Sequence, residues 1–578
     1  GQSLDDVKAL LLGEIEKLKK GEFSEDLIKA VINNQKLDFY TSLESNEGRA
    51  NMFVDAFINR QDWSDVVGRL DRISKMTKQQ IVDFANRHFK DNYIAVYKRI
   101  GEDNTVKKID KPQITAIPTN RDLQSQFVTD IINSKTEDIQ PKFVDFNTDL
   151  TKGETKKGLP VLYVKNTENG RFTLYYYYKF GETSNKWLPY AAEYFNYLGT
   201  DKMTAEQLKQ KFYELACSYY ITVGSRDMSV SISGLAENMP EAMKLMEDFI
   251  ANAKVDKDAY DKYVGIVEKS RADNKLKQRV NFSRLQYYGM YGKYSSALNC
   301  PSSAELKEMD PQKLVDMIKD LKNYKHSVLY YGPMDMKELT ATVNKEHKTA
   351  KKIVDGPQNK PYRLQQTTQN EVYIAPYDAK NIYMIQYHNE GKTWNAEQEP
   401  IAALFNEYYG GGMNTVVFQE LREARGLAYS AFAMYGTPGY KEDTEYAYTY
   451  IISQNDKMMD CINTFNSILN TMPKSDKAFE LAKQALMKRL ASSRTTKFSI
   501  INAYLNAENL GIDYDINKKI YEAVPSMTMD DVAKFEKEHM ANKPYRYMIL
   551  GDEKQLDMKA LEKIGPIKRL TTEEIFGY

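Results

Sequence analysis

The sequence has little of what disulfide-bonded, membrane-spanning or nucleic-acid-binding proteins depend on. Its 578 residues include only three cysteines, Cys217, Cys300 and Cys461, and no C-x-x-C pair, so neither a disulfide framework nor a thiolate metal site is indicated. Lys+Arg and Asp+Glu both number 80. This neutral balance argues against a nucleic-acid partner, whose phosphates need a basic surface. No stretch approaches the ~20 apolar residues of a membrane span.

The common catalytic motifs are also missing. Five histidines are present, and no two are three or four residues apart, so no helix is expected to present a pair of histidines to a metal: His88, His326, His347, His388 and His539. Each is expected to be an isolated surface side chain. There is no G-x-S-x-G elbow, and Gly410-Gly411-Gly412 is followed by Met413 rather than a phosphate-binding lysine. The triple glycine is therefore interpreted as close backbone packing or a flexible turn, with a ligand cradle as the alternative.

What the sequence does contain is a repeated layout. A methionine, a capping Thr or Asp, a helix, a short strand and a glycine follow one another from Met76, Met309 and Met527. The spacings are 309 − 76 = 233 and 527 − 309 = 218 residues, so each copy is a domain rather than a solenoid module. The strands expected in this layout are residues 94–97, 327–330 and 547–550.

The second and third copies also begin alike. Residues 161–164 and 173–177 predict a hairpin through Asn169-Gly170, and residues 372–375 and 382–387 repeat that pattern. Each copy thus predicts strand, strand, helices, strand, which is an α+β sandwich with a mostly antiparallel sheet and helices on one face. The first copy has no opening hairpin. The fold class expected is therefore two complete units and one that is truncated at its N-terminus.

These observations predict four segments. Residues 1–104 form the truncated unit, and 105–153, which are polar and carry several prolines, form an inter-domain linker. Residues 154–350 and 351–578 form the two complete units.

One segment carries a family resemblance. Residues 410–430, GGGMNTVVFQELREARGLAYS, combine a glycine-rich turn, a Phe-x-x-Leu-Arg helix end and a Gly-Leu-Ala-Tyr entry into a strand. This segment resembles the signature of the pitrilysin/insulinase family of zinc metallopeptidases. The resemblance implies that Arg422 and Tyr429 bind substrate backbone near the scissile bond. An arginine offers a rigid fork of donors, and a phenol can donate to a developing oxyanion. The alternative is a surface arginine paired with Glu420 or Glu423.

The family resemblance also implies where the chemistry lies. Its members carry four such units in two halves, and the first unit holds an H-x-x-E-H zinc motif with a further Glu ligand about 75 residues later. This chain would then cover the end of the second unit, the linker, and the third and fourth units. Zinc is expected in the missing N-terminal half, and no cofactor or catalytic residue is expected in this chain.

A degenerate form of the zinc motif supports that placement. Tyr190 and Tyr194 occupy the two histidine positions around Glu193, and Glu268 lies 74 residues beyond Tyr194, near the position of the third ligand. Protonated tyrosines are poor zinc ligands, and two carboxylates alone bind a hard cation weakly. The sequence therefore predicts no metal here, only the relics of a site.

The leading hypothesis is the C-terminal, substrate-clasping part of a chamber-forming zinc endopeptidase that acts on peptides. Its partners would be a peptide substrate and a catalytic half. The alternative is a non-catalytic peptide-binding subunit that pairs with a separate zinc-bearing chain, and a third possibility is a purely structural dimerisation scaffold. The resemblance also suggests a bacterial periplasmic or envelope location.

Overall fold

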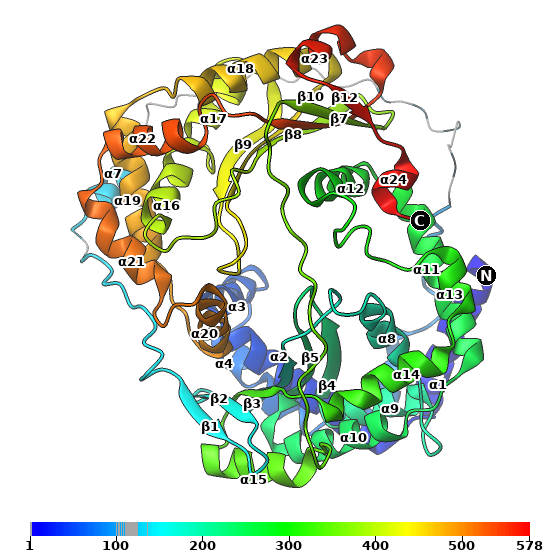
Figure 1. The fold of residues 1–578 in the computed structure, drawn as a ribbon. Helices are drawn as coiled ribbons and strands as arrows, with labels where there is room; N and C mark the ends of the chain where they lie inside the picture. The colour runs from blue at the N-terminus through cyan, green and yellow to red at the C-terminus, as the bar shows by residue number, and fades with distance from the viewer. Residues whose placement is uncertain are drawn as a thin grey trace. The chain divides into compact units, whose positions relative to one another are not determined.

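A computed structural model describes residues 3–99, 101, 105, 107, 109, 125–135 and 137–578 (Figure 1). The chain divides into two compact units. Residues 1–35 and 49–140 form one, here called the helical unit, and residues 36–48 and 141–578 form the other, the main unit. Within the described part of the chain, no helix has the length and apolar character that crossing a bilayer requires.

The helical unit contains helices α1 to α7, although the end of α2 and the first residues of α3 belong to the main unit. Their bounds are α1 Leu4–Lys20, α2 Glu25–Leu43, α3 Asn46–Ile58, α4 Trp63–Val67, α5 Arg69–Ile73, α6 Lys78–His88 and α7 Gln126–Asn133. Ser3 and Asp6 form a capping box at the start of α1, and Thr77 and Gln80 form one at α6. Each box satisfies N–H groups that the first helical turn leaves unpaired.

The strand predicted at residues 94–97 is not found. Residues 92–99 form neither strand nor helix, and Ile94 and Val96 are 91% and 89% exposed. A strand is defined by pairing with neighbours, and no described residue pairs with this segment. The prediction was wrong because propensity alone supplies no partner strand.

The main unit contains two lobes, each built around a six-stranded sheet. Lobe A has the sheet order β1-β2-β6-β3-β5-β4. Its strands are β1 Thr151–Glu154, β2 Pro160–Lys165, β3 Arg171–Tyr178, β4 Cys217–Val223, β5 Met228–Leu235 and β6 Ser327–Gly332. Its helices are α8 Leu188–Phe195, α9 Ala205–Glu214, α10 Met239–Asn252, α11 Lys257–Lys275, α12 Gln278–Tyr291, α13 Ser303–Glu308, α14 Pro311–Lys319 and α15 Met336–Glu346.

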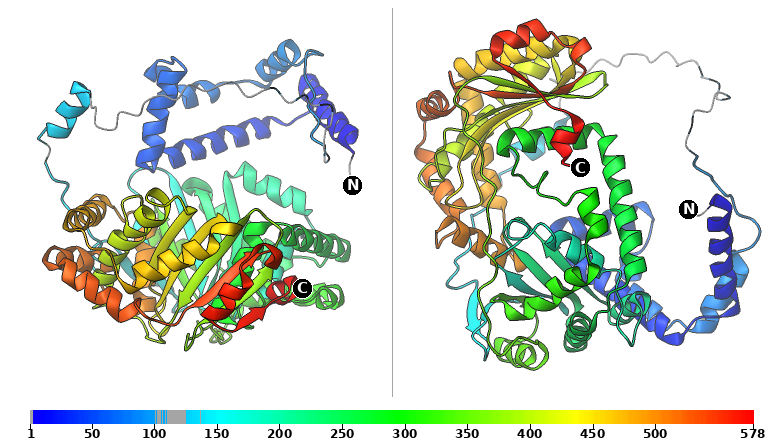
Figure 2. Two further views of the ribbon diagram at one scale, coloured as in Figure 1. Left: turned by 90° about the horizontal axis from the view of Figure 1, so that it is seen from above. Right: turned by 45° about the vertical axis from the view of Figure 1, so that its right-hand side comes forward.

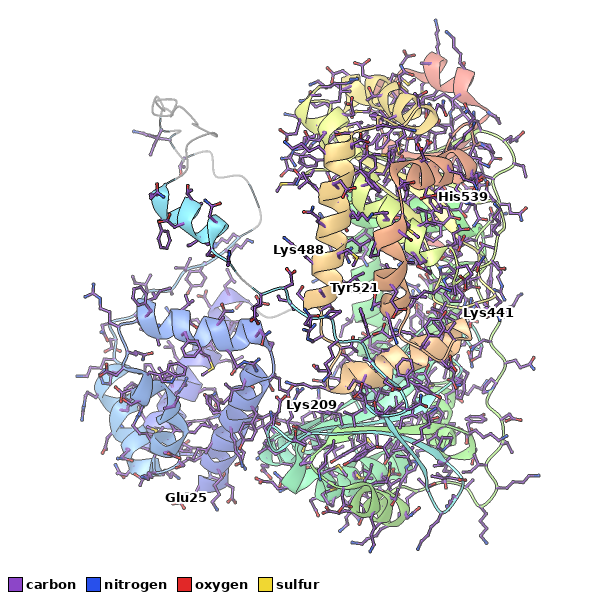
Figure 3. The ribbon with its side chains drawn as sticks, turned by 90° about the vertical axis from the view of Figure 1, so that its left-hand side faces the viewer. Glu25, Lys209, Lys441, Lys488, Tyr521 and His539 are labelled. Atoms are coloured by element: carbon purple, nitrogen blue, oxygen red, sulfur yellow. The ribbon has the colours of Figure 1, made fainter. Side chains whose placement is uncertain are left out.

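Lobe B repeats this plan in the order β12-β7-β11-β8-β10-β9. Its strands are β7 Glu371–Pro376, β8 Asn381–His388, β9 Ala428–Gly436, β10 Tyr446–Gln454, β11 Arg546–Gly551 and β12 Ile567–Arg569. Its helices are α16 Glu399–Tyr409, α17 Val416–Phe418, α18 Met458–Asn470, α19 Asp476–Ser492, α20 Phe498–Leu510, α21 Ile516–Ala523, α22 Met529–His539, α23 Met558–Ile564 and α24 Thr572–Phe576. Figure 3 shows Lys488 of α19, Tyr521 of α21 and His539 of α22 in its helical layer. The predicted α+β class is confirmed, whereas the domain boundaries remain predictions.

The two predicted hairpins are not hairpins. In lobe A, β6 lies between β2 and β3, parallel to β2 through Val161↔Val328 and antiparallel to β3 through Leu174↔Tyr330. In lobe B, β11 lies in the same way between β7 and β8. An Asn-Gly turn indicates only that the chain reverses direction. Such a turn cannot indicate that a strand from the end of the unit lies between the two strands that the turn connects.

Each lobe also covers the second face of the other lobe's sheet. Phe282 and Leu285 of α12, a helix of lobe A, pack against Ile385 and Met548 in the sheet of lobe B. Conversely, α20 of lobe B packs against lobe A, where Phe498 stacks on Tyr175 with ring centroids 4.8 Å apart. Figure 2 (right) shows the sheet of lobe B between its own helices and α12. This exchange buries both faces of each sheet and fastens the lobes together.

One buried carboxyl group in lobe B has no ion-pair partner in the part of the chain that the structure describes. Glu536 on α22 is 4% exposed, its Oε1 has no hydrogen-bond partner among the described residues, and burial raises its pKa to about 7. The folded state therefore holds a proton that the unfolded state, with a pKa near 4.5, releases earlier. Protonation supports the fold fully below pH 4.5, and this support is lost as the pH rises through about 7.

We therefore expect Glu536→Gln to stabilise the fold at pH 8 by about 2 kcal/mol, because the amide removes the cost of a buried charge. At pH 4 the same substitution should be nearly neutral. Thermal denaturation of both proteins at the two pH values measures the difference. An equal shift at pH 4 and pH 8 would contradict the assignment.

Candidate substrate-contact site

The glycine-rich turn that follows α16 packs closely on strand β9. A Cβ atom on Gly410 would lie 1.8 Å from the carbonyl oxygen of Ala433, and the Ala433 N–H donates to the Gly410 carbonyl at 3.3 Å. Only glycine allows so close an approach of two backbones. The predicted role in backbone packing therefore holds for Gly410. Gly411 and Gly412 have room for a side chain, since their nearest neighbours are 3.5 Å and 3.9 Å away.

Arg422 lies on a π-helical turn, Gln419–Glu423, that continues from α17. Such turns place side chains out of the normal helical register and occur often at functional sites. The guanidinium of Arg422 lies 4.9 Å from the ring centroid of Phe418 and 5.9 Å from that of Tyr429. Glu420 pairs instead with Arg425, at 3.2 Å. Within the described residues Arg422 makes no ion pair, so the pairing considered as its alternative role is not observed.

Tyr429 stands near the start of β9, an edge strand that pairs only with β10 among the described strands. A tight return brings it beside Arg422: the Leu427 N–H donates to the Leu421 carbonyl at 2.9 Å, and Gly426 has a positive φ of 56°. The phenol is 79% exposed. Because so little of this aromatic side chain is buried, packing does not explain the position of Tyr429.

The pair can therefore bind a polar chain from solution. The guanidinium offers several N–H donors in a fixed plane, the phenol offers one O–H donor, and the outer edge of β9 offers backbone groups. Carbonyl oxygens of an extended peptide match all three. The sequence placed the two residues seven positions apart, but it gave no sign of the π-helical turn that brings them together.

The degenerate zinc motif forms separate hydrogen-bonded contacts rather than a metal cavity. The Tyr194 hydroxyl donates to the Asp256 carbonyl at 2.7 Å, and Glu193 accepts from the Tyr263 hydroxyl at 3.1 Å. Burial raises the pKa of Tyr190 and of Tyr194, so both stay protonated at neutral pH. A protonated phenol is a weak ligand for a divalent cation.

An arginine provides the positive charge beside Tyr190 and Glu268, the other two residues of the degenerate zinc motif. Arg271 on α11 is 6% exposed, and its guanidinium donates to Glu268 at 3.4 Å and to the Tyr190 hydroxyl at 3.3 Å. It also donates to the carbonyl of Pro301 at 2.6 Å and lies 4.4 Å from the ring centroid of Tyr578. The sequence analysis missed Arg271. Its spacing of three residues from Glu268 on one helix was the available signal.

The structure also brings together two histidines that were expected to be isolated at the surface. His326 Nε2 lies 2.8 Å from His347 Nε2, while His326 Nδ1 contacts the Tyr324 carbonyl at 2.7 Å and His347 Nδ1 contacts Glu247 at 2.5 Å. Both Nδ1 atoms face oxygen acceptors and can each donate a hydrogen to them. One further proton between the two Nε2 atoms then completes the hydrogen bonds of both rings. Burial, with His347 nearby, lowers the pKa of His326 to about 4. The described residues contain no group of three or more His, Cys, Asp or Glu able to hold a metal.

Comparison with known proteins agrees with this architecture. The family model described as the peptidase M16 inactive domain matches residues 309–486. A search of curated proteins found no match. Among solved structures, the peptidase M16 inactive domain from Pseudomonas fluorescens is 14% identical, with a TM-score of 0.53 and coverage of 70% of this chain and 98% of that one.

Two longer structures are similar over nearly the whole chain. The periplasmic protease PqqL from Escherichia coli is 12% identical, with a TM-score of 0.56, and the match covers 95% of this chain and 63% of that one. The ferredoxin protease FusC, solved in complex with Arabidopsis ferredoxin, is 11% identical, with a TM-score of 0.56 and coverage of 93% and 62%. This chain thus spans less than two thirds of either protease. These matches confirm the resemblance to the C-terminal, non-catalytic portion of the pitrilysin/insulinase (M16) peptidase family.

Proposed function

We propose that this chain is the substrate-clasping part of a chamber-forming zinc endopeptidase that acts on peptides. Zinc and the general base lie in a catalytic half outside these 578 residues. Arg422 and Tyr429 bind the substrate backbone close to the bond that the other half cleaves. The observation that carries the proposal is their arrangement: a guanidinium without an ion-pair partner among the described residues lies beside a 79% exposed phenol.

The electrostatics of this pair suit such a role. Donors that are not already neutralised by a carboxylate can stabilise negative charge that develops on a carbonyl oxygen in the transition state. The Phe418 ring, 4.9 Å from the guanidinium, restrains the arginine without taking its N–H donors. The free edge of β9 can pair with an extended peptide, which would favour unfolded substrates over folded ones.

The proposal also includes the lack of a metal site among the residues that the structure describes. Tyr190, Tyr194, Glu193 and Glu268 each have a protein partner, and Arg271 provides the cation beside Glu268. The catalytic half could be part of the same polypeptide or a separate zinc-bearing chain. The similarity to longer proteases, of which this chain spans less than two thirds, favours the former.

The experiment that tests the assigned contact is replacement of Arg422 by alanine in the complete enzyme. A large loss of kcat/KM with an unchanged fold is expected. A dimerisation scaffold without peptide contact would show no loss.

A further inference from the structure

A hollow lined by tyrosines lies between the two lobes of the main unit, at the end of strand β9 that is far from Tyr429. Its volume is about 460 Å³, within the range of ligand-binding pockets. The loop that joins β9 to β10 forms one wall, and residues of lobe A form another. Five of the lining side chains are aromatic: Tyr287, Tyr291, Tyr362, Tyr440 and Tyr446.

The charged groups that line the hollow neutralise one another. Arg226 of lobe A is 8% exposed and donates to Glu442 at 2.9 Å and to Asp443. Arg363 also donates to Asp443. Two guanidinium groups thus face two carboxylates, and a ligand finds no unpaired charge among these groups. Burying an unpaired ion costs more than burying a neutral group, so an uncharged ligand fits the hollow best.

The tyrosines present polar groups as well as rings. Within the described part of the chain, the hydroxyl groups of Tyr287, Tyr291 and Tyr446 have no hydrogen-bond partner. Burial raises the pKa of Tyr291 to about 12, so its hydroxyl stays protonated and can donate at neutral pH. Surfaces rich in tyrosine bind peptides well, because the rings give a large contact area at little cost in conformational entropy.

A row of aromatic rings connects the hollow with the candidate substrate-contact site. Phe432, three residues after Tyr429 on β9, stacks on Tyr450 with ring centroids 4.9 Å apart. It also contacts Tyr448 edge-on at 5.7 Å, and Tyr448 stacks on Tyr446 of the hollow at 5.9 Å. The row therefore follows one face of the sheet from the neighbourhood of Tyr429 to the hollow.

The ring of Tyr446 extends over the end of the edge strand. Tyr446 pairs with Gly436, the last residue of β9, and a Cβ atom on Gly436 would lie 2.6 Å from this ring. Tyr429 and Gly436 are seven residues apart, which is about 24 Å in an extended strand. A peptide that pairs with the edge of β9 would therefore have its seventh or eighth residue from Tyr429 beside the hollow.

We propose that the hollow anchors the substrate peptide through an uncharged aromatic side chain seven or eight residues from the cleaved bond. This ring stacks on the tyrosines of the hollow, and their hydroxyl groups donate to carbonyl oxygens of the same peptide segment. The inference rests on the proposed function, because it takes Arg422 and Tyr429 to lie at the cleaved bond. It adds a preference for substrates that carry an aromatic residue at this distance.

Kinetics of the complete enzyme test the position of the anchor. The substrates are unfolded peptides that share one cleaved bond and carry a single tryptophan in place of alanine, at successive positions on either side. We expect tryptophan at the seventh or eighth position on one side to lower KM about tenfold, because its ring gains stacking contacts. The value of kcat should change less than about twofold. A tryptophan effect only next to the cleaved bond, or none at any position, would overturn the inference.

Variants of two exposed tyrosines show whether the effect comes from the hollow. Tyr287→Ala removes a 40% exposed ring of α12, and the matched control Tyr220→Ala removes a 61% exposed ring of strand β4 in lobe A. The tryptophan effect should disappear in Tyr287→Ala and persist in Tyr220→Ala. Tyr287→Phe keeps the ring and should retain most of the effect. An unchanged tryptophan effect in Tyr287→Ala would refute the anchor.

Photocrosslinking to the 578-residue chain tests the contact without catalysis. The probe is an unfolded, uncharged peptide in which p-benzoylphenylalanine is the one aromatic residue. We expect its crosslinks to map to residues 287–291 and 437–446, and to weaken about tenfold in Tyr287→Ala but not in Tyr220→Ala. Crosslinks that avoid both segments would contradict the inference.

Failure of the anchor and failure of the proposed function give different results. Crosslinks in the hollow of a protein whose native form cleaves no peptide would leave a peptide-binding hollow and refute the proposed function. Cleavage that depends on Arg422 but shows no tryptophan effect would refute the anchor alone.

Discussion

Replacing Arg422 by alanine in the complete enzyme should lower kcat/KM for peptide cleavage by about 100-fold or more. In the proposed role the guanidinium donates to the substrate where charge develops, and loss of one such donor typically costs about 10²–10³ in rate. The side chain is exposed and makes no ion pair among the described residues, so the fold should not depend on it. Its melting temperature should stay within about 1 °C of the wild-type value, as for other surface substitutions.

The matched control for this prediction is Arg425→Ala. Arg425 lies three residues away, is also exposed and carries the same charge, but it pairs with Glu420. Its loss should change kcat/KM by less than about threefold, because a surface ion pair contributes little. Arg422→Lys keeps the charge but not the planar fork, and it should fall between the two. A wild-type kcat/KM in Arg422→Ala would refute the substrate contact.

Replacing Arg271 by methionine should destabilise lobe A by about 3 kcal/mol. Methionine fills the space, but it leaves the Pro301 carbonyl without its donor and Glu268 without its cation, with only the Ser303 hydroxyl still donating to it. For a unit of this size the melting transition should fall by roughly 5–10 °C. Differential scanning calorimetry of the 578-residue chain measures this shift.

Arg279→Met, an exposed position on α12, is the control and should melt within about 1 °C of the wild type. Added zinc should not restore the stability of Arg271→Met, because Glu193 and Tyr194 are bound to partners elsewhere. Wild-type melting of Arg271→Met would show that the guanidinium is not needed. Rescue by zinc would show that the relics can still form a metal site.

The sequence predicted the repeated units because each one carries a capped helix and a short strand at the same interval. Thr77 and Thr528 cap α6 and α22 through local contacts, and local signals of this kind can be read directly from a sequence. The insertion of β6 between β2 and β3 could not be read in this way. It depends on pairing between residues more than 150 positions apart, such as Val161 and Val328.

In the candidate site, too, local features could be predicted from the sequence, whereas contacts between distant residues could not. The resemblance identified Arg422 and Tyr429, but their proximity depends on a π-helical turn for which no sequence pattern is known to us. The relic residues were identified by spacing, whereas Arg271 was missed because its partners Tyr190 and Pro301 are distant in sequence. The failed strand prediction at residues 94–97 has a related cause: the local pattern is typical of a strand, but no described residue pairs with this segment.

The most direct test of the account measures zinc and peptide hydrolysis together in two samples. One is the native protein isolated from its source cells with an antibody against this chain, and the other is this 578-residue chain alone. We predict one zinc ion for each catalytic half and chelator-sensitive cleavage of unfolded peptides in the native protein, and neither in the chain alone. A native protein that contains no zinc, or cleavage by the chain alone, would contradict the account.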